Sequence, residues 1–422
     1  MTSRSANQSS PLFRDSRLLL YLFVSFRLML LLVHQPQPGY TPGLTAFGDF
    51  SYFYDLAKLA DQGKLPYRDY WFEYPPVIAL VSQGVYTVIH FRGGDFTTYT
   101  LLLNLVLLAF DTGTLILIRR IGTRLFGAAT GMALAWIYAV IAIPLVISFW
   151  TFDSIVAFLT LLAITWLIDR RDTYSAITTA IGALTKLMPL VILGAVWRYR
   201  TISQALAFSL IAVGLTVVGF AVILAIAGQY GLPSLTVQFN KASAETVWAL
   251  ADGNYKTGIL NPDHLDPASA SQLQGNRAVI PVWLRTAIFG AIGLYVYATT
   301  RRRDNRGVMA FVGISFALFY LWSPNWSPQW LVTLIPLILL NFPSRNGVIL
   351  VLGLGFVSFI EYPVLFARTN GEISGPLLPI FVLLILLRTA LLIGFTYGLY
   401  RRLRVEIGET SDSAQSSMNL LD

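Results

Sequence analysis

The sequence predicts an all-α, polytopic membrane protein with about twelve transmembrane helices. Hydrophobic residues make up 55% of the 422 residues, charged residues only 12%, and the mean hydropathy is +0.63. This composition excludes a disordered chain and is not that of an ordinary soluble globular protein. Apolar runs recur along the whole chain with arginine clusters at their ends, as in proteins that cross a bilayer many times.

A helix needs about 20 apolar residues to cross a bilayer. The runs 173–185, 187–198 and 330–342 are shorter, so neighbouring helices would have to bury them. The run 76–91 is ambiguous, because it is short and contains polar residues. We expect spans at residues 17–34, 99–118, 126–147, 152–168, 173–185, 187–198, 202–226, 281–300, 307–322, 330–342, 346–365 and 376–400.

The distribution of arginine decides whether residues 76–91 cross the membrane. If this run lies at the membrane surface, the later arginine clusters fall on the same side as the amino terminus. That side then holds more than half of the 30 lysines and arginines, as the positive-inside rule requires of the cytoplasmic face. We therefore expect an interfacial helix at 76–91 and two cytoplasmic termini. The clusters lie at residues 119–124, 170–171, 198–200, 301–306, 345 and 401–404.

This topology divides the chain into four parts. Residues 1–16 are polar, lack a signal-peptide cleavage pattern and are expected to form a cytoplasmic tail. Residues 17–342 form a membrane core with extracytoplasmic loops at 35–98 and 227–280. Residues 343–404 add carboxy-terminal transmembrane helices, and residues 405–422 form a second cytoplasmic tail. The expected location is the plasma membrane.

Composition also limits the chemistry. The chain has no cysteine, which excludes disulfides, thiolate metal sites and cysteine nucleophiles. Its three histidines are scattered, so we expect no metal site and no cofactor. The net charge of +8 does not indicate nucleic-acid binding, because the basic residues cluster at the ends of apolar runs.

The loop at 35–98 concentrates acidic and aromatic residues. It contains Gly48-Asp49-Phe50 and Glu73-Tyr74-Pro75-Pro76, with further acids and tyrosines between them. Carboxylates next to a bilayer are costly unless they have a partner or a role. All five lysines also fall on the extracytoplasmic side, where positive charge is disfavoured. Together these residues indicate a functional site on that face.

The chain resembles the GT-C superfamily of integral-membrane glycosyltransferases that use polyprenyl-phosphate sugars. Within it, the chain is most similar to bacterial polyprenol-phosphate-mannose-dependent mannosyltransferases of the cell envelope. The resemblance covers roughly residues 17–340 and leaves out the carboxy-terminal spans. It depends on residues 48–54, 63–69, 73–76, Asp153, 185–189 and 327–330, which occur in the family's usual order.

The resemblance implies an inverting transferase that acts at the extracytoplasmic face. A sugar, by the resemblance mannose, would move from a polyprenyl-phosphate donor to a hydroxyl of a glycolipid or glycan acceptor, without a metal. The protein's other partners would be membrane lipids and not nucleic acid. Because the phosphate is already a good leaving group, the reaction needs a base for the acceptor and cations for the phosphate. Asp49 matches the position of the family's base. Alternatively, Asp49 caps a helix that starts near Phe50.

Glu73, Arg68 and Asp153 are candidate substrate-binding residues on the same face. Glu73 is either a second carboxylate of the site or an ion-pair partner of Arg68. Arg68 and Asp69 are adjacent and are expected to form a solvated local pair. Asp153 either contacts the acceptor and supports the base, as the resemblance implies, or caps the following helix.

Basic residues are the candidates for binding the donor phosphate. Lys186 lies between two short apolar runs and would either bind the phosphate or neutralise an acid. Lys241 belongs to the second loop and is free to lie farther out. Arg277 and Arg285 are further phosphate candidates, since arginine forms bidentate bonds to phosphate, although they could instead bind lipid headgroups.

Four other features complete the prediction. Gln329, next to Trp330, either lines the sugar pocket or belongs to an aromatic interface anchor. His264 is expected in a turn. Charged residues inside predicted spans, here Arg27, Asp111 and Arg388, are candidates for function. The favoured explanation is an ion pair between Asp111 and an arginine that holds helices together. The alternative function is a lipid-linked sugar flippase or polytopic transporter, which would need no base.

Overall fold

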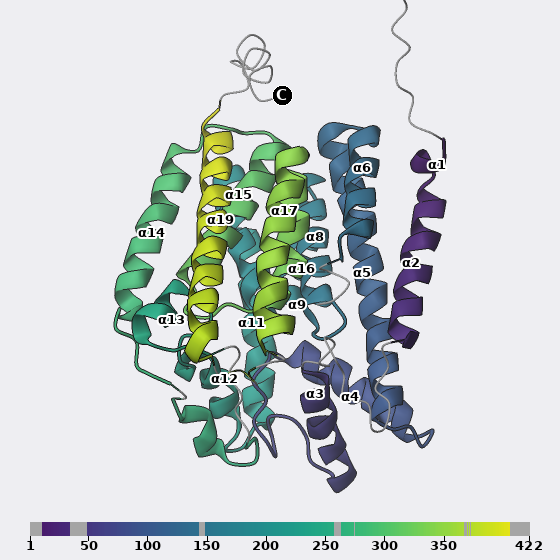
Figure 1. Ribbon diagram of the computed structural model, residues 1–422, viewed down its shortest axis with the longest axis vertical. Coiled ribbons are helices and arrows are strands. Elements are labelled where there is room, and N and C mark those ends of the chain that lie inside the picture. The colour runs from purple at the N-terminus through teal and green to yellow at the C-terminus, as the bar shows by residue number, and fades with distance from the viewer. Residues whose placement is uncertain are drawn as a thin grey trace, which may run out of the picture.

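The computed structural model describes residues 11–33, 49–142, 148–256, 263–273, 275–366, 369, 371 and 373–405. In this part of the chain the regular elements are helices, and no β-strand is present. Figure 1 shows the helices standing side by side, with α1 and the end of α19 at one end of the molecule and α3, α4 and α12 at the other. The predicted all-helical fold class is confirmed.

Among the described residues, seven helices are long and apolar enough to cross a membrane. Most of the side chains of α11 and α14 are exposed, as expected for helices that face lipid. The seven are α2 (Ser16–Val33), α5 (Phe96–Phe126), α11 (Ile202–Ile226), α14 (Val282–Thr299), α15 (Asn305–Trp322), α17 (Arg345–Phe359) with its π-helical extension η5 (Ile360–Phe366), and α19 (Leu378–Arg404) with the preceding turn η6 (Gly375–Leu377).

Shorter helices occupy the remaining predicted spans. Every residue of α16 is buried, and α8 is nearly as buried. Because other helices surround them, the lengths of these two helices need not match the thickness of a bilayer. The number of membrane crossings stays a prediction, and residues 143–147 lie outside the described residues. The shorter helices are α6 (Ala128–Val140), α8 (Asp153–Ile168), α9 (Asp172–Ala183), η2 (Met188–Val191) with α10 (Ile192–Tyr199), and η4 (Pro328–Trp330) with α16 (Leu331–Asn341).

The predicted interfacial helix is α4 (Pro76–His90), which packs against α3 and α5 at the end of the molecule away from α1 (Figure 1). Two prolines begin it, and a proline at the first helical position costs no hydrogen bond. Its Val77 N–H donates to the Leu184 carbonyl at 3.0 Å. The other elements outside the predicted spans are α1 (Pro11–Arg14), α3 (Phe50–Lys58), η1 (Leu59–Gln62), α12 (Gly231–Asn240), α13 (Val247–Asp252) and η3 (Pro267–Ser271).

The arginine clusters meet at the end of the molecule where α5 finishes, as the charge pattern predicts. Arg120 pairs with Asp169 at 2.8 Å, and Arg200 pairs with Asp172 at 2.8 Å. Further links join the same end: Arg306 Nε donates to the Leu125 carbonyl at 3.0 Å, and the Arg301 N–H donates to the Leu403 carbonyl at 2.8 Å. These clusters therefore share one face.

Arg27 and Arg388, which are both buried within predicted spans, each have an acidic partner. Arg27 Nε binds Asp111 at 2.7 Å with both side chains 0% exposed, and the Tyr138 hydroxyl donates to Asp111 at 2.6 Å. The predicted Asp111–arginine pair is confirmed, and it joins α2 to α5. Arg388 pairs instead with Glu361 of η5.

Single cysteines test the orientation, since the chain has none of its own. Ser51 and Ala129 are exposed at opposite ends of the molecule. We expect the Ser51→Cys variant to react with a membrane-impermeant maleimide added to intact cells and the Ala129→Cys variant to react only after lysis. The reverse pattern would place the arginine-rich end outside.

Candidate active site

Asp49 immediately precedes α3, but its carboxylate does not cap that helix. No hydrogen bond joins the side chain to the first turn of α3. Instead, the Tyr74 hydroxyl donates to Asp49 Oδ2 at 3.3 Å. The interpretation of Asp49 as a helix cap is therefore wrong. Helix α3 is held by its buried face, where Phe50 and Phe53 pack into the aromatic cluster below the site.

Two lysine–carboxylate pairs accompany Asp49. Lys186 Nζ lies 2.8 Å from Asp153 Oδ1, and Lys241 Nζ lies 2.6 Å from Glu73 Oε2. Asp153 is 1% exposed in its side chain, so its charge depends on the lysine for compensation. The role of Lys186 in neutralising an acid is confirmed. No cap bond from the Asp153 side chain is present in the described structure, and the residue begins α8.

Glu73 corrects one interpretation of the sequence, because it does not pair with Arg68. Its partner is Lys241 of the second loop, whose side chain is about as buried as that of Lys186. The reason is that side chains of the second loop form hydrogen bonds with the backbone of the first and hold the two loops together. Gln238 Nε2 donates to the Glu73 carbonyl at 3.1 Å, and the Phe72 N–H donates to Ser234 Oγ at 3.0 Å.

Trp71 is the main link between the two loops. Its backbone N–H donates to the His264 carbonyl at 3.1 Å, and its indole N–H donates to the Asp263 carbonyl at 2.9 Å. The His264 ring packs against the Trp71 ring with centroids 3.8 Å apart, and its Nδ1 lies 2.9 Å from the Trp71 carbonyl. His264 is thus part of the connection between loops. Residues 257–262 of the loop lie outside the described part of the chain.

The second loop is also attached to the segment before η4. The Ala244 N–H donates to the Pro324 carbonyl at 3.2 Å, and the Trp326 N–H donates to the Ala244 carbonyl at 3.1 Å. This short parallel bridge holds the chain just after Lys241 next to the predicted 327–330 motif.

Aromatic rings form the surroundings of Lys186. Its ammonium lies 5.4 Å from the centre of the Phe152 ring and 5.8 Å from that of Trp330. The Phe152 ring meets the Tyr74 ring edge-on, with centroids 4.8 Å apart. Rings can stabilise a cation while restricting water, so Lys186 lies in a largely apolar enclosure with one buried acid.

The electrostatics distinguish Asp49 from its neighbours. Burial raises the pKa of Asp49 to about 7, and the Glu73 and Asp153 carboxylates add to this effect, while Lys186 and Lys241 oppose it. Burial alone would also raise the pKa of Glu73, but the Lys241 ammonium, together with the Tyr74 hydroxyl and His264, lowers that pKa below its ordinary value. Within the described structure Asp49 forms no ion pair, because the two nearby lysines are bound to the other acids.

The other predicted site residues do not join this cluster through direct contacts. Arg68 pairs with Asp69 at 2.8 Å at the surface, as the local-pair interpretation predicts. Arg277 is exposed. Arg285 is buried, with its guanidinium 5.4 Å from the centre of the Trp248 ring of α13. Gln329 is half-buried in η4.

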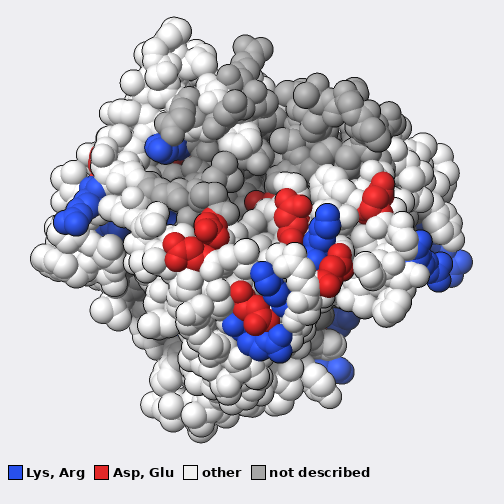
Figure 2. Space-filling view, turned by 90° about the horizontal axis from the view of Figure 1, so that it is seen from below, with Lys and Arg blue, Asp and Glu red and all other residues white. Residues whose placement is uncertain are grey.

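Two participants were missed by the sequence prediction. Tyr74, which binds Asp49, looked like one of many interface tyrosines. Lys241 carried a usable signal, namely a lysine on the face where positive charge is disfavoured, but nothing in the sequence identified its partner. Figure 2 shows this end of the molecule from below, with acidic and basic groups intermixed and not gathered into a field of one sign.

No protein-family model matches the chain, and a search among curated proteins finds no significant match. Within the described residues, no three His, Asp or Glu side chains gather into a group that could hold a metal ion. The site offers one carboxylate of raised pKa, two lysine–carboxylate pairs and an aromatic enclosure, contributed by five separate segments of the chain.

Proposed function

We propose that this protein is an inverting glycosyltransferase that moves a sugar from a polyprenyl-phosphate donor to an acceptor hydroxyl. The observation that carries the proposal is the state of Asp49: a part-buried carboxylate without an ion pair and with a pKa near 7, next to two ammonium groups. A general base works best when its pKa lies near the working pH.

The proposed reaction assigns one role to each kind of group. The acceptor oxygen attacks C1 of the donor sugar, and its proton passes to an Asp49 carboxylate oxygen. The bond between C1 and the phosphate oxygen breaks, and its electron pair leaves with the lipid phosphate. Attack and departure on opposite faces of C1 invert the anomeric centre.

Lys186 and Lys241 are the cations available to the departing phosphate. Each ammonium has three donors, of which its carboxylate partner accepts one in the hydrogen bonds observed. The remaining donors can contact phosphate oxygens while the carboxylates keep the lysines in place. Charge that develops on the leaving group would be stabilised by such preorganised cations.

The finer parts of the proposal follow the resemblance and the charge pattern. The fold would be of GT-C type with twelve spans, and the site would face the extracytoplasmic side of the plasma membrane. The sugar would be mannose, and the acceptor a glycolipid or glycan. Asp153 and Gln329 would then contact sugar hydroxyls, while Arg68, Arg277 and Arg285, which lie outside the direct contacts of the cluster, have weaker support.

Purified protein should be incubated with a panel of polyprenyl-phosphate sugars and candidate acceptors, and the products analysed by mass spectrometry and NMR. We expect a glycosylated acceptor of inverted anomeric configuration and a released polyprenyl phosphate. Absence of product with every pair, combined with movement of the intact donor across liposome membranes, would favour the flippase.

The pH profile gives a second test of the base. Because Asp49 accepts a proton only when ionised, we expect kcat/KM to be constant above its pKa of about 7 and to fall about tenfold per pH unit below it. The measurement is kcat/KM against pH with the best donor. A profile that stays flat down to the ordinary carboxyl range near 3.8 would contradict a base of raised pKa.

A further inference from the structure

A small pocket lies at the arginine-rich end of the molecule, between α5 and α8. Asp49 lies at the opposite end, next to α3. The last turns of α5 and α8 form the pocket, with a cavity of about 200 Å³. This volume exceeds that of a single water several times over, so a phosphate-sized group can enter. The lining residues are Arg120, Ile121, Thr123 and Arg124 of α5, and Thr165, Ile168 and Asp169 at the end of α8.

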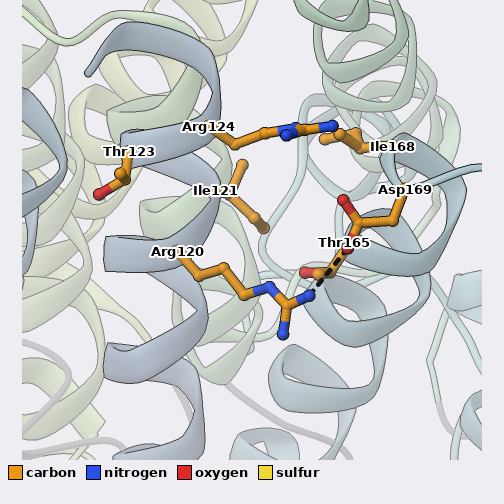
Figure 3. Close-up of a pocket in the computed structure, with 7 residues that line it drawn as sticks. All are labelled: Arg120, Ile121, Thr123, Arg124, Thr165, Ile168 and Asp169. Carbon is orange, nitrogen blue, oxygen red and sulfur yellow. Dashed lines mark hydrogen bonds and ion pairs between the residues drawn. The ribbon is translucent and has the colours of Figure 1, made fainter. Parts of the chain in front are cut away.

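The pocket carries an excess of positive charge. Figure 3 shows the guanidinium groups of Arg120 and Arg124 reaching from α5 toward α8, on either side of the Asp169 side chain. Only Arg120 pairs with Asp169, through one nitrogen at 2.8 Å. Arg124 makes no hydrogen bond or ion pair with the described residues, and a guanidinium has five N–H donors. Two arginines thus lie near a single acid that pairs with only one of them, and most of their N–H donors are available.

Aromatic side chains indicate where the pocket lies relative to the membrane surface. The guanidiniums of Arg120 and Arg171 lie 5.9 and 5.3 Å from the centre of the Trp166 ring, and the exposed Tyr174 ring lies 5.7 Å from Trp166. Tryptophan and tyrosine concentrate at the level of lipid headgroups. These rings therefore place the pocket at the level expected for lipid headgroups.

We propose that this pocket binds the phosphate of an anionic phospholipid in the leaflet at the arginine-rich end, with Arg120 and Arg124 as its ligands. The charge distribution assigns that end to the cytoplasmic face, where anionic lipids attract basic groups. Asp169 competes with the lipid for Arg120 and so limits the affinity. The proposal is independent of the transferase chemistry.

Native mass spectrometry of the purified protein with phosphatidylglycerol and phosphatidylcholine tests this site. We expect tighter binding of phosphatidylglycerol, and a loss of about fivefold or more in its affinity in the Arg124→Gln variant, as for a charge-assisted contact that is partly exposed. The Asp169→Asn variant should bind the anionic lipid more tightly than the wild type. A role of Asp169 in stability alone would not produce that gain.

The matched control is Arg345→Gln, which removes the same charge from an exposed position at the start of α17, outside the pocket. It should leave lipid binding unchanged, and the thermal midpoint of Arg124→Gln should equal that of the wild type. Equal loss in both arginine variants would reduce the site to a diffuse charge effect. Equal binding of phosphatidylcholine, or displacement of the lipid by millimolar inorganic phosphate, would overturn the assignment to a lipid headgroup.

Discussion

Replacing Asp49 by asparagine should lower turnover about 10²–10⁴-fold, the usual cost of losing a positioned general base. The change keeps the shape of the side chain and its ability to accept the hydrogen bond from Tyr74, so the fold should persist. Because Asp49 makes no ion pair in the described structure, its loss leaves no lysine without a partner. The measurement is single-turnover transfer, with the thermal midpoint recorded alongside.

The matched control is Asp55→Asn, since Asp55 is an exposed acid of α3 in the same loop. It should turn over like the wild type. An Asp49→Asn enzyme that retained more than about a third of the wild-type rate would lie far above the cost expected for a base, and Glu73 or Asp153 would then have to be tested in that role.

Neutralising the Lys186–Asp153 pair should raise the donor KM or lower the rate at least about tenfold, since charge-assisted contacts to phosphate are worth about 1.5–3 kcal/mol. The single Lys186→Ala change is ambiguous, because it leaves Asp153 buried without a counter-charge, which costs about 3–5 kcal/mol of stability. The double variant Lys186→Met with Asp153→Asn removes both charges together. We expect this double variant to fold and still to show the raised donor KM or the lowered rate.

Two comparisons complete this test. Lys58→Met, at an exposed position of α3, removes a lysine from the same face and should change nothing. The single variant Asp153→Asn measures how much of any change in the acceptor KM comes from the loss of the Asp153 carboxylate. A double variant with wild-type donor kinetics would show that the pair is only structural, and the phosphate would then have to be bound by Lys241.

Local patterns in the sequence were sufficient for most of the fold. Each of the twelve predicted spans coincides with a helix or a helix pair. The apolar runs were a sufficient signal because a helix that is buried in lipid or among other helices needs apolar residues along its whole length. The arginine pattern also predicted which helix ends lie together. Asp49, Asp153 and Lys186 were identifiable because a motif order or a break between short runs marks them.

Contacts between distant segments were not predictable in this way. Glu73 and Lys241 are 168 positions apart, and any acid of the first loop was an equally good partner from sequence alone. Arg68 was the nearest basic residue along the chain, but a five-residue separation says nothing about side-chain direction once Trp71 fixes the loop. The contribution of the carboxy-terminal spans was equally hidden, because the resemblance ends near residue 340.

Arg388 anchors a loop that the ribosome makes long before it makes Arg388 itself. This residue of α19 donates to the Glu245 carbonyl, close to Lys241 in the chain, and its guanidinium lies 4.6 Å from the centre of the Trp326 ring. At about 5–20 residues per second, a ribosome needs roughly seven to thirty seconds to proceed from residue 245 to residue 388. Throughout that interval the loop that carries Lys241 lacks one of its anchors, and from its own synthesis until that of Arg388, Glu361 in η5 lacks the arginine that neutralises it. Chains that stop before α19 would therefore lack this anchor of the loop and the counter-charge of Glu361.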